Sequence, residues 1–257
     1  MKNSYFKDNG FELLLGDSFD VIKQTKSKSI DMIFADPPYF LSNNGITCHS
    51  GTMVSVNKAS WDKTDMTVND KLSFNRRWLK KCKRVLKDSG TIFISGTLHN
   101  IYIIGVALEM EGYQIINNIT WKKLNPPPHL ARKAFTHSTE TILWARKKGE
   151  KYLFNYNQMK QFNLGKQMKD VWEFPLTKKS EKKCGKHPTQ KPLDLLRRII
   201  LASTTEGHIV LDPFNGSGTT GIAASELKRK YIGIDLEKEY LDLTICRYKG
   251  VTHEKKI

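Results

Sequence analysis

A turn of sequence Asp-Pro-Pro-Tyr carries the first residues that could do chemistry. Residues 30–35 (IDMIFA) predict a buried strand, and Asp36-Pro37-Pro38-Tyr39 must end it because proline cannot donate to a sheet ladder. The Asp36 carboxylate and the Pro37 carbonyl can accept the two N–H groups of an exocyclic amine, and the Tyr39 ring can stack on its base. Fixed acceptors turn the nitrogen lone pair towards an electrophile and stabilise the developing positive charge. The turn therefore predicts chemistry at a base amine, with a rigid turn as the structural alternative.

A glycine-rich turn late in the chain has the features of a cofactor site. Residues 210–221 (VLDPFNGSGTTG) place Gly216, Gly218 and Gly221 at GxGxxG spacing, and Asp235 ends the next predicted strand. In sites for adenosine-bearing cofactors, such glycines allow close approach of the ligand and the acid binds the ribose hydroxyls. A strand–helix turn without a ligand is the alternative.

Asp212 distinguishes between the possible cofactors. A carboxylate at the tip of this strand would repel a pyrophosphate but would suit a cationic amino-acid group. The residue therefore favours S-adenosylmethionine over a nicotinamide cofactor. No lysine follows the second glycine, so the turn is not a phosphate-binding loop of the NTPase kind.

Strands alternate with helices along the chain. The patterns predict strands at 11–15, 30–35, 91–95, 113–121, 141–145, 208–211 and 231–234. They predict helices at 18–24, 69–87, 99–111, 193–200, 217–227 and 237–247. This order indicates an α/β fold with a doubly wound, mostly parallel seven-stranded sheet covered on both faces. We expect one domain over residues 1–257, with insertions of little periodicity at about 40–68 and 147–187.

The charge points to an anionic partner. The chain has 42 Lys and Arg against 26 Asp and Glu, a net charge of +16. Residues 146–191 contribute +9 of this, from 13 basic and 4 acidic side chains, and residues 76–87 carry seven basic side chains. Cations that neutralise phosphates gain affinity by releasing counterions, and aromatic side chains among them can stack on bases. Charge alone is also compatible with a role in solubility.

Composition excludes several other classes of protein. A hydrophobic fraction of 39% with 10% aromatic residues supports a packed core, which excludes a disordered chain. No apolar run is long enough for a membrane helix, and the N-terminus lacks a signal-peptide pattern, so we expect a soluble cytoplasmic protein. The cysteines lie far apart and suggest neither a zinc site nor a disulfide framework; they are Cys48, Cys82, Cys184 and Cys246.

The two motifs together resemble those of the DNA amino-methyltransferases of restriction–modification systems. The catalytic motif precedes the cofactor motif, as in class beta, a circularly permuted arrangement of one Rossmann-like fold. Further matching segments are FADPPYFLS, NNITWKK, THSTETILWARKK, HPTQKPLDLLRRII and GIDLEKEY. Aspartate as the first catalytic residue resembles the adenine-N6 enzymes more than the cytosine-N4 ones. HNIYIIGVALEMEGY and KQMKDVW resemble the GATC-modifying Dpn-type adenine methylases that accept single strands.

This resemblance implies S-adenosylmethionine as methyl donor, no metal, and a target adenine that is flipped out or single-stranded. The implied catalytic residues are Asp36, Pro37, Pro38 and Tyr39. The implied cofactor-binding residues are Asp17, Ser18, Asp36, Thr189, Lys191, Asp212, Phe214, Asn215, Gly216, Ser217, Gly218, Thr219, Thr220 and Asp235. Thr189 and Lys191 could meet the methionine carboxylate or could simply begin a helix. His137 and Glu140 are expected to hydrogen-bond at a strand entry rather than to act as acid or base.

DNA, double- or single-stranded, is the expected partner, with recognition assigned to 40–68, 122–138 and 147–187. The family often forms homodimers, and a cognate restriction endonuclease would be a genetic rather than a physical partner, in a bacterium or phage. A cytosine-N4 methyltransferase is the alternative within the family. A nicotinamide-dependent dehydrogenase would explain the glycine turn but not Asp36–Tyr39, and a non-catalytic nucleic-acid binder would explain only the charge.

Overall fold

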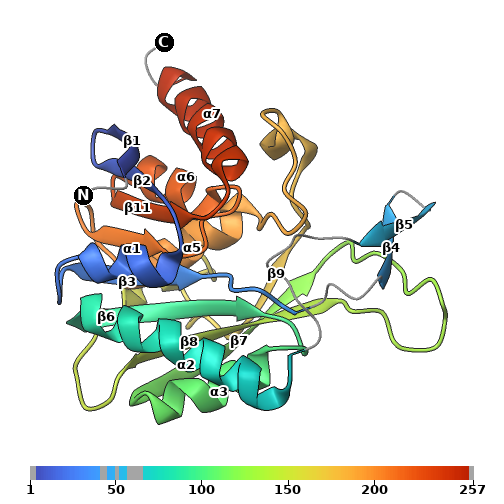
Figure 1. The fold of residues 1–257 in the computed structure, drawn as a ribbon, viewed down its shortest axis with the longest axis horizontal. Coiled ribbons are helices and arrows are strands. Elements are labelled where there is room, and N and C mark those ends of the chain that lie inside the picture. The colour runs from blue at the N-terminus through green and yellow to red at the C-terminus, as the bar shows by residue number, and fades with distance from the viewer. Residues whose placement is uncertain (1–3, 41–44, 50–51, 57–65, 255–257) are drawn as a thin grey trace.

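The computed structural model describes residues 4–40, 45–49, 52–56 and 66–254, and its centre is one large sheet (Figure 1). The strands of this sheet are β1 (Ser4–Asp8), β2 (Phe11–Leu15), β3 (Ile30–Ala35), β6 (Leu86–Gly96), β7 (Tyr113–Lys123), β8 (Thr139–Lys147), β9 (Val171–Phe174), β10 (Ile209–Asp212) and β11 (Lys230–Asp235). Their spatial order is β1-β2-β11-β10-β3-β6-β8-β7-β9. The predicted α/β class and mostly parallel sheet are confirmed.

The sheet has two strands more than the seven predicted, and both lie at its edges. β1 pairs antiparallel with β2. Asn9 and Gly10 connect them with positive φ angles of 43° and 82°, the backbone of a tight hairpin turn. At the other edge β9 pairs parallel with β7 over four residues. A four-residue strand is too short for its alternation to stand out in the sequence.

Helices cover both faces of the sheet, which divides the core in two. One face carries α1 (Ser18–Gln24), α2 (Val68–Val85) and α3 (Ile101–Met110), and the other carries α5 (Leu193–Ser203), α6 (Thr219–Glu226) and α7 (Lys238–Glu254). Trp78 is completely buried in the first core and Tyr231 in the second. Asp17 caps α1 through the Phe19 N–H, and Thr67 with Asp70 forms a capping box on α2.

The predicted recognition insertions contain elements that the sequence did not indicate. Within 40–68 lies a hairpin of β4 (Gly45–His49) and β5 (Thr52–Val56), while 41–44, 50–51 and 57–65 fall outside the described residues. Within 147–187 lie α4 (Tyr156–Gln161), β9 and a 3-10 turn at Lys179–Lys182. In Figure 1 the β4–β5 hairpin extends from the same side of the molecule as the loop between β7 and β8.

Two contacts tie sequence-distant segments to α7. Cys184 and Cys246 form a disulfide, so the expectation of no disulfide was wrong. These cysteines are 62 residues apart and meet only because the segment before α5 packs against α7, which spacing does not reveal. β1 also contacts α7: the Tyr5 hydroxyl donates to Asp242 at 2.6 Å and the Tyr248 hydroxyl donates to Asp8 at 2.9 Å.

Within the described ranges, no helix combines the length and the apolar character needed to cross a membrane.

Candidate active site

Four neighbouring parallel strands end at one cavity of about 200 Å³. β2, β11, β10 and β3 run in the same direction, so their carboxyl ends share one edge of the sheet. Each strand brings a carboxylate to the cavity: Asp17 follows β2, Asp36 follows β3, and Asp212 and Asp235 end β10 and β11. The sheet thus joins the Asp-Pro-Pro-Tyr turn and the glycine-rich turn in one site.

All the residues predicted to bind the cofactor line this cavity except Gly218. They are Asp17, Ser18, Asp36, Thr189, Lys191, Asp212, Phe214, Asn215, Gly216, Ser217, Thr219, Thr220 and Asp235. Gly218 instead begins α6 in left-handed backbone, with φ of +71°. A Cβ there would lie 2.3 Å from the Thr244 side chain, so this glycine serves the close packing of α6 on α7.

The glycine-rich turn holds Asp235 in a fixed orientation. The Gly216 N–H donates to Asp235 Oδ2 at 2.7 Å and the Glu237 N–H donates to Oδ1 at 2.9 Å. Gly216 reaches this geometry with a φ of +50°. Burial raises the pKa of Asp235 to about 6. The carboxylate is therefore pre-oriented at the cavity edge, with lone pairs left for a ligand hydroxyl pair.

Asp212 is more deeply buried than Asp235. It accepts from the Thr220 hydroxyl at 2.6 Å and from the Phe214 N–H at 3.0 Å. Burial raises its pKa to about 7, because only these two neutral donors offset the loss of water around the charged form. A bound cation would restore the ionised form, so the residue suits the cationic end of a ligand.

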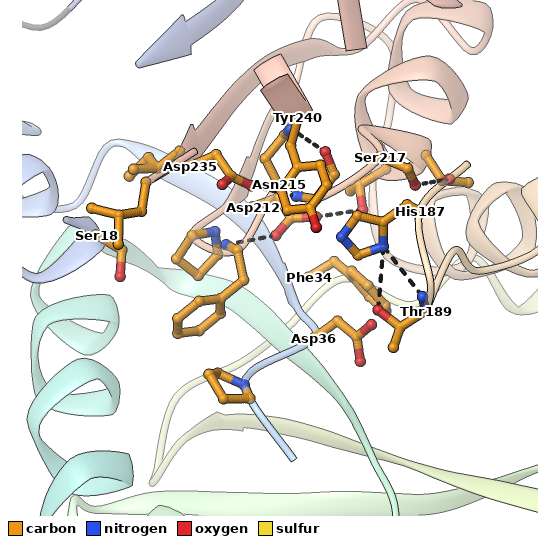
Figure 2. A pocket seen from close by; sticks show the side chains of 18 of the residues that line it. Ser18, Phe34, Asp36, His187, Thr189, Asp212, Asn215, Ser217, Asp235 and Tyr240 are labelled. Carbon is orange, nitrogen blue, oxygen red and sulfur yellow. Dashed lines mark hydrogen bonds between the residues drawn. The ribbon is translucent and has the colours of Figure 1, made fainter. Parts of the chain in front are cut away.

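Aromatic side chains that the sequence analysis did not single out form the apolar walls of the cavity. Phe19 comes from α1, Phe34 from β3 and Phe74 from α2. Figure 2 shows Phe34 between the Asp36 end of the cavity and the Asp212 and Asp235 end. Flat apolar walls between polar ends suit a ligand that carries an aromatic base.

His187 and Tyr240 were also missed, although the segments HPTQKP and GIDLEKEY contain them. Their rings pack edge to face at 4.4 Å beside the glycine-rich turn (Figure 2). Burial lowers the pKa of His187 to about 4, assisted by the positive charges of Lys191 and Arg247. His187 is therefore neutral at pH 7, and its Nδ1 lies 3.3 Å from the Thr189 hydroxyl.

The Asp-Pro-Pro-Tyr turn is held by a lysine from far along the chain. Asp36 and Pro38 line the cavity, whereas Pro37 and Tyr39 do not. The Tyr39 hydroxyl donates to Asp36 Oδ1, and the Lys191 ammonium lies 2.6 Å from Asp36 Oδ2 and 2.7 Å from the Tyr39 hydroxyl. Lys191 therefore does more than begin a helix, and the Tyr39 ring does not offer the predicted stacking face in this arrangement.

Two buried asparagines, which the sequence did not indicate as site residues, hold the Asp-Pro-Pro-Tyr turn through hydrogen bonds. Asn100 donates to the Pro38 carbonyl at 3.0 Å, and Asn75 donates to the Asn100 side chain at 2.8 Å. The indole of Trp78 donates to Asn75 at 3.0 Å. Both asparagines are completely buried, so this chain of hydrogen bonds fixes the turn against α2 and α3.

Glu140 and His137 differ in their surroundings. Glu140 begins β8 as expected, but its carboxylate lies 2.9 Å from Lys123 and 3.5 Å from Lys191, which joins it to the Asp36 cluster. His137 is exposed in the loop between β7 and β8. Among the described residues, no group of His, Cys, Asp and Glu could hold a metal ion.

Comparison with known proteins finds similarity over nearly the full length of the chain. A family model described as DNA methylase matches residues 30–245. A Type II methyltransferase of Lactococcus lactis subsp. cremoris, M2.LlaDCHI, is 57% identical over 256 residues, covering 98% of this chain and 95% of its own. M2.DpnII of Streptococcus pneumoniae is 58% identical over 252 residues, covering 97% and 94%. M2.MboI of Moraxella bovis is 49% identical over 251 residues, covering 96% and 92%.

Solved structures share the same architecture. The M1.HpyAVI–SAM complex is 29% identical with a TM-score of 0.69, covering 91% of this chain and 97% of that chain. The PvuII DNA methyltransferase, described as cytosine-N4-specific, has a TM-score of 0.77 at 16% identity, covering 96% of this chain and 89% of that chain. At that identity the likeness concerns the fold alone.

Proposed function

Because this chain belongs to the DNA methylase family and is a DNA methyltransferase, we propose that it transfers a methyl group from S-adenosylmethionine to N6 of adenine. One observation carries the proposal: Asp36 lies on the wall of the same cavity that the glycine-rich turn and Asp235 line. A ligand on that turn would extend towards the carboxylate that receives the target amine. Family membership also removes the dehydrogenase and the non-catalytic binder as alternatives.

The residues of the cavity fit this methyl donor. Asp235 would take the ribose hydroxyls, Asp212 the ammonium group, and Asp17 with Ser18 the adenine amine. The aromatic walls described above would hold the base. Lys191 faces Asp36, so Thr189 is the better candidate for the methionine carboxylate.

The chain supplies geometry and charge to the reaction. S-adenosylmethionine provides a methyl group on a positively charged sulfur. Asp36 and the Pro37 carbonyl accept from the target amine and direct its lone pair at the methyl carbon. As the carbon–nitrogen bond forms, the carbon–sulfur bond breaks and its electron pair remains on sulfur. The nitrogen releases one proton, for which Asp36 is the acceptor.

Adenine is proposed over cytosine on the first residue of the catalytic turn. Aspartate in Asp36–Tyr39 resembles the adenine-N6 enzymes, and cytosine N4 is the second candidate. The fold does not decide between them, because a neighbour described as cytosine-N4-specific has the same architecture. The base would be flipped out or presented in a single strand.

The biological setting proposed is a restriction–modification system in the cytoplasm of a bacterium or phage-infected cell. The relatives are bacterial Type II methyltransferases, and the resemblance to Dpn-type enzymes makes GATC the first sequence to test. We propose one catalytic domain over 1–257, with DNA recognition by 40–68, 122–138 and 147–187. A homodimer and a cognate endonuclease encoded nearby complete the proposal.

The variant Asp36→Ala tests the chemistry. We expect methyl transfer to DNA to fall by at least about a thousandfold because the amine loses its carboxylate acceptor. Binding of DNA should largely survive. Asp20→Ala, on the exposed surface of α1, is the control that should keep full activity. Unchanged transfer by Asp36→Ala would refute the proposed mechanism.

Identification of the methylated base tests the substrate. Digested DNA from cells that express the protein should contain N6-methyladenine by mass spectrometry, and sequencing of modified positions should give one recognition sequence. Detection of N4-methylcytosine instead would show that the target is cytosine N4, the second candidate.

A further inference from the structure

Four charged side chains form a nearly closed cluster behind the catalytic turn. Lys191 lies between Asp36 and Glu140, with Nζ 2.6 Å from Asp36 Oδ2 and 3.5 Å from Glu140 Oε2. Lys123 lies on the far side of Glu140, 2.9 Å from Oε1. The four side chains are only 6% to 14% exposed, and their charges sum to zero. Each ion therefore depends on its neighbours rather than on water.

The two carboxylates of the cluster, Asp36 and Glu140, differ in their hydrogen-bond partners. Both oxygens of Asp36 accept from protein donors, Oδ1 from Tyr39 and Oδ2 from Lys191. Glu140 Oε2, by contrast, is buried and has no hydrogen-bond partner among the described residues. Burial would raise the pKa of Glu140, but the Lys191 and Lys123 ammonium groups lower it below its ordinary value. The Glu140 carboxylate thus meets Lys191 only at ion-pair distance, 3.5 Å, and not in a short hydrogen bond.

The Lys191 ammonium competes with the target amine for Asp36. The amine must donate to a carboxylate whose oxygens already accept from Tyr39 and Lys191, and the ammonium offsets the negative charge that would stabilise the positive charge developing on the amine. A buried ammonium cannot simply be released, because an unpaired buried charge costs several kcal/mol. Moving Nζ by about 1 Å would give it a normal charge-assisted hydrogen bond to Glu140.

We propose that Glu140 is a positioning residue that takes over the Lys191 ammonium when the target amine binds, and so frees Asp36 for the amine. The inference rests on the proposed function of Asp36. It assigns Glu140 a role in the reaction without contact to the substrate. Lys123 keeps Glu140 ionised and holds its other oxygen.

The test combines Glu140→Gln with Lys191→Met. In the chain with Lys191, Glu140→Gln should slow single-turnover methyl transfer at saturating DNA by at least about tenfold, the loss of one charged hydrogen bond. In the Lys191→Met background, the same substitution should change the rate by less than about twofold, because no ammonium remains to be moved. Equal losses in both backgrounds, or no loss in either, would overturn the inference.

The affinity for S-adenosylhomocysteine separates positioning from a structural role, and in Glu140→Gln it should stay near that of the unaltered protein. The melting temperature of the variant should fall because Lys123 and Lys191 lose a buried partner, so the transfer rates are compared below both melting transitions. The control Glu206→Gln removes an exposed carboxylate that pairs with Lys228 at 3.4 Å, and it should leave the transfer rate unchanged. If Glu140→Gln does not fold, Glu140→Asp carries the same comparison, because it withdraws the carboxylate from Lys191 and keeps its charge.

The outcomes also distinguish this inference from the proposed function. An unaltered protein that methylates no DNA base would refute the proposed function. Methylation that is insensitive to Glu140→Gln would refute only the role of Glu140. Methylation of cytosine N4 would leave the inference intact, because that amine would also need Asp36.

Discussion

At the scale of single residues, the site holds opposite charges on side chains that are largely buried. Asp212 and Asp235 lie on one side of the cavity and Asp36 lies on the other (Figure 2). Lys191 pairs with Asp36 at 2.6 Å. The buried acids cost stability in the free protein and gain a partner when a cationic ligand binds. Function and stability therefore conflict at these positions.

Asp212→Asn should reveal this conflict as a dependence on pH. Burial raises the pKa of Asp212 to about 7 from an ordinary value of 3.8, so the folded chain keeps a proton that the unfolded chain releases. The free energy of unfolding therefore falls as pH rises from about 4 to 7. Asp212→Asn removes this loss and should raise stability at pH 8 by roughly 1–3 kcal/mol, a gain that shrinks towards pH 4.

Thermal unfolding at pH 4.5 and pH 8 measures this effect, and calorimetry with S-adenosylmethionine measures its cost. Affinity for the methyl donor should fall by about tenfold or more, because the ammonium group loses a charged partner. Asp20→Asn, on the exposed surface of α1, should shift neither quantity. A stability change of the same size at both pH values would contradict the assignment of the effect to Asp212.

At the scale of elements, most strands and helices could be predicted from local pattern, whereas the contacts between them could not. β3 and β10 were recognised because their apolar runs end at Asp-Pro turns, the second of which is rich in glycine. The Asp36–Lys191 ion pair joins residues 155 positions apart, and no local signal indicates it. Asn75 and Asn100 look like ordinary helix residues until α2 and α3 bury them together. The four residues of β9 are too few to show the alternation of apolar and polar residues that marks a strand.

The disulfide between Cys184 and α7 gives a prediction at this scale. It closes a loop over 62 residues, and a cross-link of this span stabilises a fold by about 4 kcal/mol through restriction of the unfolded chain. Cys184→Ser should therefore lower the denaturation midpoint of oxidised protein. In the presence of a thiol reductant, the variant and the unaltered protein should unfold together.

Cys246→Ser and the double variant serve as controls, and both should match Cys184→Ser. An unaltered protein whose unfolding is indifferent to reductant would show that the bond contributes nothing. In reducing surroundings the pair would be present as thiols, and α7 would then be held without the cross-link.

At the scale of the whole molecule, the net charge of +16 and the exposed aromatic residues indicate how DNA would bind beside the cavity. Phe135 is 96% exposed in the loop between β7 and β8, and Arg132 and Lys133 in that loop are also exposed. A fully exposed phenylalanine beside cations suits stacking on a base with phosphate contacts alongside. All three side chains lie in residues 122–138, one of the segments predicted to recognise DNA.

Phe135→Ala and Arg132→Gln should weaken DNA binding in different ways. The phenylalanine variant should lose affinity by about five- to a hundredfold with an unchanged dependence on salt, because stacking releases no counterions. The arginine variant should lower the slope of log affinity against log salt by about one. Binding titrations between 50 and 200 mM salt measure both. Tyr102→Ala, exposed on α3, is the control, and equal slopes for all three proteins would contradict a phosphate contact at Arg132.

The contact between β1 and α7 has a consequence for the order in which a gene could encode the parts of this fold. The first strand and the last helix already touch through the Tyr5–Asp242 and Tyr248–Asp8 hydrogen bonds. A gene duplicated in tandem and then trimmed at both ends could therefore encode the same sheet with the glycine-rich turn translated before the Asp-Pro-Pro-Tyr turn. Such an exchange would change the order in which the ribosome makes the two halves and would leave unchanged the place where they meet.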